Sequence, residues 1–300
     1  MFTPTLARTA VAALALVAAG AASAQTRTWS FLDNVNPGAC SGNTTSAGGT
    51  LSTASGNAWN CTDQATNAPA FNLAITAFSA ANVRADSLLA TSNNNVGGTS
   101  ANNFATSTIV LHGGQAPTPV TDNYGLGVGN SITESGSSTT GTNGNHAMDS
   151  NDGSTDMLLL SFSTTQVLRS VVMGWSGTDG DFQVLACTTA SLCSSAPTIA
   201  GRNAASLLSN GWSLVTTVNA PGGGFVPDQS FAVNSGSVSS SYWLISAYNS
   251  SFGGTSLGSV GDSLKVMGVT SRPNGVPEPG SLALAGMALL GVFASRRKLS

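Results

Sequence analysis

The sequence predicts an all-β domain: a β-sandwich of jelly-roll-like topology with long loops rich in Gly, Ser and Asn. Three observations lead to this prediction. Almost no stretch repeats its apolar residues at the helical period, many short runs alternate apolar with polar residues, and clusters of Asn, Gly, Ser and Asp separate those runs. Many short strands with turn signals between them are typical of packed antiparallel sheets. An immunoglobulin-like sandwich is the alternative topology.

The candidate strands share short length and turn residues on both sides. In chain order they are residues 29–34, 71–79, 107–113, 156–163, 167–175, 181–187, 211–219, 229–234, 241–249 and 262–270. Residues 71–79 and 181–187 show alternation, which indicates one buried face. Residues 156–163 and 167–175 are more uniformly apolar, as expected of central strands covered on both faces.

A single short helix is expected around Leu207, in the run AASLLSNGW. We expect the two sheets to face each other across a core of large side chains. Its expected members are Phe162, Trp175, Trp212 and Trp243.

The first 24 residues have the three parts of a secretory signal peptide. Arg8 is basic, residues 10–22 are small and apolar, and Ala22-Ser23-Ala24 matches the small-x-small pattern before a cleavage site. We therefore predict that signal peptidase cuts between Ala24 and Gln25. The predicted domains are the signal peptide (1–24), the extracellular β-sandwich (25–272) and a C-terminal segment (273–300).

Charged residues make up only 8% of the chain, against about 25% in ordinary globular domains. The formal net charge is −3, so we expect no nucleic-acid partner. Gly, Ser, Thr and Asn dominate residues 41–56, 91–105 and 129–145, which predicts long surface loops there.

The four cysteines are Cys40, Cys61, Cys187 and Cys193. Export exposes them to an oxidising compartment, which favours disulfides. Three pairings are possible, and the most local one, Cys40–Cys61 with Cys187–Cys193, is favoured. A zinc site is not favoured, because the chain has no C-x-x-C and its two histidines lie near no cysteine in the sequence.

The densest polar cluster is HAMDSNDGSTD, residues 146–156, which contains Asp149, Asp152 and Asp156. Asp179 and Asp181 form a second acidic pair after Trp175. Carboxylates in Gly-rich loops suit a hard cation, so these five residues are candidate calcium ligands. The spacing does not fit an EF-hand, and side chains that cap strand ends are the alternative interpretation.

No catalytic constellation is assembled in the sequence, and we expect no enzyme activity. Neither histidine lies in a setting typical of a serine hydrolase. No carboxylate pair suits a glycosidase, and the Gly-rich run at residues 125–131 lacks the Gly-Lys end of a phosphate-binding loop. The five tryptophans suggest carbohydrate binding, but core packing is the more common role of such residues.

The C-terminus combines a turn motif, an apolar span and a basic end. Pro277 and Pro279 keep the motif out of any helix. Residues 281–295 predict a helix of about 22 Å, shorter than the ~30 Å hydrocarbon core, and flanking basic side chains can make up part of the difference. The expected membrane residues are Leu282, Leu284, Met287, Leu289, Leu290, Val292 and Phe293, followed by Arg296, Arg297 and Lys298.

This segment resembles the PEP-CTERM sorting signal, the substrate tag of exosortase in Gram-negative bacteria. The resemblance rests on Val276-Pro277-Glu278-Pro279, the apolar span and the basic end, in that order. It implies a transient inner-membrane anchor, removal of the tail by exosortase, and delivery to the cell surface or extracellular matrix. Substrates of this kind are often associated with exopolysaccharide and biofilm.

The body also resembles a group of exosortase-dependent surface proteins. The stretches that carry this resemblance are HAMDSNDGSTDMLLLSF, VVMGWSGTDGDFQVLA, SSYWLISAYN and DSLKVMGV. We therefore expect a structural or adhesive surface protein with exosortase and signal peptidase as processing enzymes. A calcium-dependent carbohydrate-binding module and a hydrolase with an unrecognised site are the alternatives.

Overall fold

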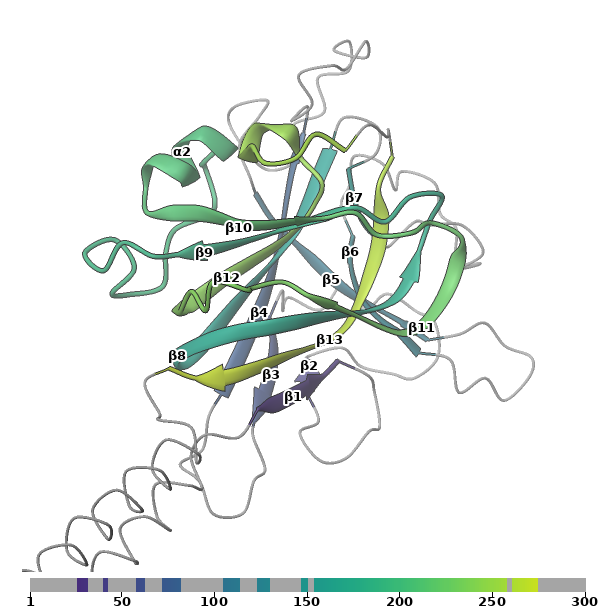
Figure 1. Ribbon diagram of the computed structural model, residues 1–300, viewed down its shortest axis with the longest axis horizontal. Helices are drawn as coiled ribbons and strands as arrows, with labels where there is room; N and C mark the ends of the chain where they lie inside the picture. The colour runs from purple at the N-terminus through teal and green to yellow at the C-terminus, as the bar shows by residue number, and fades with distance from the viewer. Residues whose placement is uncertain are drawn as a thin grey trace, which may run out of the picture.

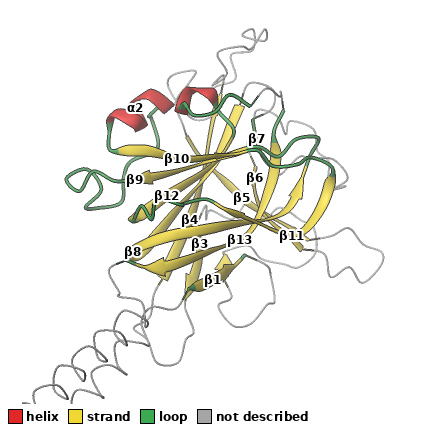
Figure 2. Cartoon of the chain, in the orientation of Figure 1, coloured by secondary structure: helices red, strands yellow, loops and turns green. Residues whose placement is uncertain are grey.

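The computed structural model describes residues 26–31, 40–42, 58–62, 72–81, 105–113, 123–129, 147–150, 154–257 and 261–274. It confirms the predicted all-β class, because strands dominate these residues and helices are few (Figure 2). The predicted signal peptide, the Gly/Ser-rich loops and the C-terminal segment lie largely or wholly outside the described residues.

Thirteen strands form one hydrogen-bonded sheet (Figure 1). They are β1 (Arg27–Ser30), β2 (Cys40–Gly42), β3 (Ala58–Thr62), β4 (Asn72–Ala81), β5 (Ala105–Gly113), β6 (Asn123–Gly129), β7 (Met148–Asp149), β8 (Ser154–Ser176), β9 (Phe182–Cys187), β10 (Trp212–Val218), β11 (Gly224–Ala232), β12 (Ser240–Ala247) and β13 (Ser263–Pro273). A short helix, α2 (Ala204–Ser209), and a 3-10 turn, η1 (Ser250–Phe252), accompany them.

The long strand β8 organises the sheet. Its first half pairs with β4 and β12, and its second half pairs with β13 and β11, all antiparallel. From β13 the ladder continues through β6 and β5 to β4, which leads back to β8. The sequence predicts two separate sheets that face each other. The structure instead has a single sheet that curves round, so that both halves of β8 line one core.

This main core is apolar and rich in aromatic rings. Trp29 meets Phe162 edge-on at 5.8 Å between ring centroids, and Phe182 meets Phe231 at 5.6 Å. Trp243 is fully buried, and its indole Nε1 donates a hydrogen bond to the carbonyl of its own strand's first residue. The polar atom of this buried ring is therefore satisfied.

A second apolar cluster lies on the other face of the sheet. Leu158 and Leu160 of β8 belong to the main core, whereas the alternate residues Met157 and Leu159 pack with Leu207 of α2 in the second cluster. The run MLLL is therefore apolar throughout because both faces of this strand are covered.

Helix α2 covers this second cluster, as the sequence predicted around Leu207. Asn203 caps it by accepting a hydrogen bond from the Ser206 backbone N–H, and Ser206 Oγ accepts one from the Asn203 N–H. This reciprocal capping box satisfies two N-terminal donors of a helix only six residues long.

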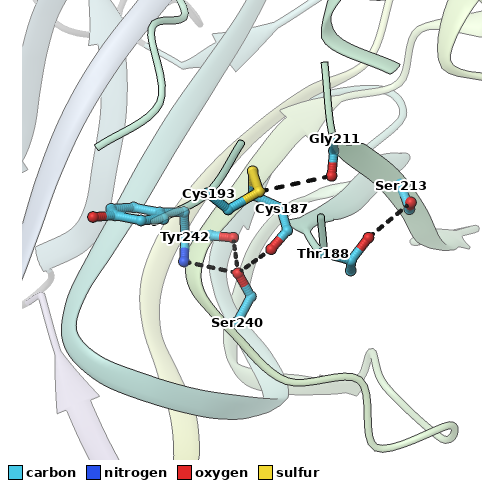
Figure 3. Close-up of a disulfide and its surroundings, with 7 residues drawn as sticks. All are labelled: Cys187, Thr188, Cys193, Gly211, Ser213, Ser240 and Tyr242. Carbon is cyan, nitrogen blue, oxygen red and sulfur yellow. Dashed lines mark hydrogen bonds between the residues drawn. A yellow bond between two sulfur atoms is a disulfide. The ribbon is translucent and has the colours of Figure 1, made fainter. Parts of the chain in front are cut away.

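Cys187 and Cys193 form a disulfide with Cα atoms 5.8 Å apart, which confirms the predicted pair (Figure 3). The bond closes the chain between β9 and α2. Beside it, Ser240 Oγ donates to the Cys187 carbonyl at 2.7 Å and accepts from the Tyr242 N–H. Cys61 is also disulfide-bonded, and Cys40 lies opposite it in the β2–β3 register, as the predicted Cys40–Cys61 bond requires.

Several strand predictions need revision. The runs at residues 156–163 and 167–175 are one continuous strand, β8, and not two. Trp175 is half-buried and not a core residue, and its ring lies beneath the Lys265 ammonium at 5.3 Å. Four strands were not predicted, namely β2, β3, β6 and β7, which are short or rich in glycine and small polar residues.

Gly125 in β6 allows this strand to approach β13. It has a φ of 94°, and a Cβ at this position would overlap backbone atoms of Val266 and Met267. We expect Gly125→Ala to lower the free energy of unfolding by about 2 kcal/mol or more, since both backbone strain and overlap oppose a side chain. Urea unfolding measures this effect.

The matched control is Gly236→Ala, where an added Cβ meets no atom within 4 Å. This variant should stay within about 0.5 kcal/mol of the wild type. Equal stabilities for the two variants would contradict the close packing of β6 on β13.

Candidate functional site

Three carboxylates meet at one end of the sheet. One carboxylate oxygen each from Asp179, Asp181 and Asp262 lies within 4.8 Å of the other two. Asp181 and Asp262 are buried, and Asp179 is half-buried. Among the residues that the structure describes, this is the group that could hold a metal ion.

Backbone pairing holds Asp179 beside Asp262. The two residues form a β-bridge, and the Ser263 N–H donates to the Asp179 carbonyl at 2.9 Å. Ser150 binds Asp262 twice: its N–H donates to the carbonyl and its Oγ to carboxylate Oδ2, both at 2.9 Å. The loop after β8 and the start of β13 are thereby joined to the segment around β7.

Asp181 is held from two further segments. Its Oδ1 accepts a hydrogen bond from the Ala220 N–H at 2.9 Å, and its carbonyl accepts one from the Tyr248 N–H at 3.1 Å. The loop after β10 therefore fixes the Asp181 side chain, and the residue after β12 fixes its backbone. The group is thus assembled from segments far apart in the sequence.

The electrostatics of the group oppose ionisation of Asp181. Burial raises the pKa of its carboxyl, the neighbouring Asp179 carboxylate raises it further, and the Ala220 N–H acts in the opposite direction. The repulsion between the Asp179 and Asp181 carboxylates is reduced either by a proton held between them or by a bound cation. Oxygen ligands of this kind suit a hard cation such as calcium.

The structure divides the five predicted calcium ligands. It brings Asp179 and Asp181 together, whereas Asp149 and Asp156 are not members of the three-carboxylate group among the described residues. Asp156 is buried, and its oxygens accept from Ser79 Oγ at 2.5 Å and from the Asp149 N–H at 3.3 Å. Asp152 lies outside the described residues.

Asp262 was not predicted as a site residue. The only local signal is the Gly-Asp pair directly before the last strand. Its partner Asp179 lies more than 80 positions earlier in the chain, so no spacing pattern links the two residues.

The first and the last strand pair at another end of the sheet. Arg27, at the start of β1, pairs with Ser271 near the end of β13. After β13 the Asn274 N–H donates to the Thr165 carbonyl of β8 at 3.2 Å. The predicted cleavage position at Gln25 is therefore two residues before the paired Arg27, and the motif at Val276 begins two residues after the hydrogen-bonded Asn274.

The predicted cleavage and tail residues, Ala24 and Gln25, Val276–Pro279 and 282–298, lie outside the described residues. Within the part of the chain that the structure describes, no helix is long and apolar enough to cross a membrane.

A compact all-β body that runs directly into a motif, an apolar span and a basic end defines a protein sorted through its C-terminus. The family model of the PEP-CTERM protein-sorting motif matches residues 275–298, so the chain carries this sorting signal. The signal indicates an exported protein that is anchored in a membrane, processed by exosortase and sorted to the surface. No curated protein and no solved structure matches the chain.

The raised pKa of Asp181 predicts a pH dependence of stability. The folded state holds this proton to higher pH than the unfolded chain, so stability should fall as the pH rises from about 4 through the raised pKa. Asp181→Asn removes this titration and keeps an oxygen that can accept from Ala220. We expect the variant to gain stability relative to the wild type between about pH 4 and pH 7, measured by urea unfolding with EDTA present. A constant difference across this range would contradict the prediction.

Proposed function

We propose that this protein is a non-enzymatic structural or adhesive component of the surface or extracellular matrix of a Gram-negative bacterium, linked to exopolysaccharide or biofilm. The observation that carries the proposal is the PEP-CTERM motif directly after the last strand of the body. The motif supplies the route to the surface, and the body is what remains there after the tail is removed.

The chemistry of the body supports a role outside the cell. Disulfides persist in oxidising compartments, and the cysteines in the described residues are all bonded. Exposed hydroxyls pair with each other on the surface, as in Thr165 with Ser241 at 3.3 Å and Thr188 with Ser213 at 3.2 Å. Uncharged hydroxyl surfaces of this kind can exchange hydrogen bonds with a polysaccharide without charge repulsion.

The proposed processing has two cuts. Signal peptidase removes residues 1–24 during export. The apolar span and Arg296, Arg297 and Lys298 then hold the chain in the inner membrane, with the basic end in the cytoplasm. Exosortase acts at Pro277-Glu278-Pro279, which the prolines keep extended and outside a helix.

We expect the mature protein to begin at Gln25 and to lack residues 282–300. Intact-mass analysis of protein released from cells with exosortase measures both ends. In cells without exosortase the mass should instead extend from Gln25 through Ser300. A full tail in exosortase-containing cells would contradict the proposal and leave a permanent membrane anchor.

A calcium-dependent carbohydrate-binding module is a second candidate. The observation that favours it is the group of Asp179, Asp181 and Asp262, in which one oxygen from each carboxylate lies within 4.8 Å of the other two. Calcium takes 6–8 oxygen ligands, so backbone carbonyls, water or sugar hydroxyls would complete the shell. A cation shared with sugar hydroxyls would link the site to exopolysaccharide.

We expect millimolar calcium to raise the melting temperature, since a ligand of the folded state stabilises it by mass action. The double variant Asp179→Asn with Asp262→Asn should lose this shift. Asp156→Asn, at a carboxylate outside the group, should keep it. A calcium shift that survives the double variant would exclude this site, and no shift in the wild type would exclude calcium binding.

A further inference from the structure

We propose that the end of the sheet where the first strand begins and the last strand ends is the surface that contacts the membrane enzyme during tail removal. This surface, the processing end, consists of Asn72, the exposed residues Ser163–Thr165 in the middle of β8, and Asn274. The inference rests on the proposed function, because it requires that the tail is removed at the PEP-CTERM motif.

The first argument is the position of the chain ends. β1 pairs antiparallel with β13, so the start of one strand and the end of the other lie at the same end of the sheet (Figure 1). In the same way, Pro273 pairs with Gln166, next to the exposed middle of β8. The tail therefore leaves the body beside residues 163–165.

The second argument is the short length of chain between the body and the motif. Asn274 is still hydrogen-bonded to the Thr165 carbonyl, at 3.2 Å. Only Gly275 separates it from Val276. Two residue steps span at most about 7 Å, so the first residue of the motif stays within that distance of Asn274.

The third argument is that buried hydrogen bonds hold the end of β13 in place. The Trp29 indole Nε1 donates to Ser271 Oγ at 2.9 Å, and Ser271 Oγ donates to Gln166 Oε1 at 3.2 Å. Gln166 Nε2 then donates to Thr164 Oγ1 at 3.0 Å. Trp29, Ser271 and Gln166 are each at most 2% exposed, so fraying this end would leave buried polar groups without partners.

An enzyme that binds the motif therefore meets a folded body and not a loose chain. The binding cleft of the enzyme must hold several extended residues of the motif, so the walls of this cleft extend beyond the first of these residues toward the body. Because Val276 lies at most about 7 Å from Asn274, the walls of the cleft lie against the processing end. Ser163, Thr164 and Thr165 are exposed and uncharged, so they allow close approach without a desolvation cost for charge.

The test combines a bulky change at the processing end with a longer connection. Thr165→Arg adds a large cation at an exposed position whose hydroxyl makes only a surface contact with Ser241. We expect it to slow tail removal by at least about tenfold in exosortase-containing cells, followed by pulse-chase labelling. Twelve Gly/Ser residues inserted between Asn274 and Gly275 should restore the wild-type rate in this variant, because the enzyme can then bind the motif without contacting the folded body.

The matched control is Thr255→Arg. Thr255 is exposed and follows the end of β12 that lies away from Ser241, so this variant should be processed at the wild-type rate. Equal rates for Thr165→Arg and wild type would overturn the proposal. A slow rate that the insertion does not relieve would also overturn it, because the defect would then lie in the body itself.

A thiol-labelling experiment distinguishes a contact between the processing end and the enzyme from a contact with the membrane surface. Thr165→Cys should react with a membrane-impermeant reagent in cells that lack exosortase as fast as Thr255→Cys does. Protection of Thr165→Cys in those cells would assign the contact to lipid and overturn the proposal. Failure of the wild type itself to lose its tail would instead refute the proposed sorting function.

Discussion

The participation of β8 in both layers is the constraint on which the rest of the fold depends. Its first half is bonded to β4 and β12 and its second half to β13 and β11. The strand has 23 residues, well beyond the usual length of about 5–6, because it serves both layers. The described strands are arranged around β8, with the three-carboxylate group after its end and the proposed processing end at its middle.

The sequence predicts those parts of the fold that local chemistry determines. The MLLL run indicates a strand buried on both faces, the capped helix lies around Leu207, and Cys187 pairs with its near neighbour Cys193. The strand β6 is not predictable in this way. Its Gly-rich sequence has no alternation, and the reason for Gly125 is the backbone of Val266 and Met267, in a strand much later in the chain.

The same division applies to the site. Asp179 and Asp181 are found from their local spacing, whereas Asp262 joins them only through a bridge between distant segments. Asp156 lies in the polar run that looked most suited to a cation, yet a serine hydroxyl and a backbone N–H occupy its oxygens. The sorting signal, by contrast, is recognisable from the sequence alone, because it is defined by the order of the motif, the apolar span and the basic end along the chain.

The pairing of the first strand with the last also sets the time at which folding can finish. Trp29 and Ser271 are hydrogen-bonded across a separation of 242 residues. At a synthesis rate of about 5–20 residues per second, β1 waits roughly 10–50 s for its partner to be made. A hairpin forms in about 1–10 μs, so the delay comes from chain delivery and not from strand pairing itself. The chain can therefore cross the membrane before its fold is complete, and the arrival of β13 both closes the sheet and brings the sorting motif to the membrane.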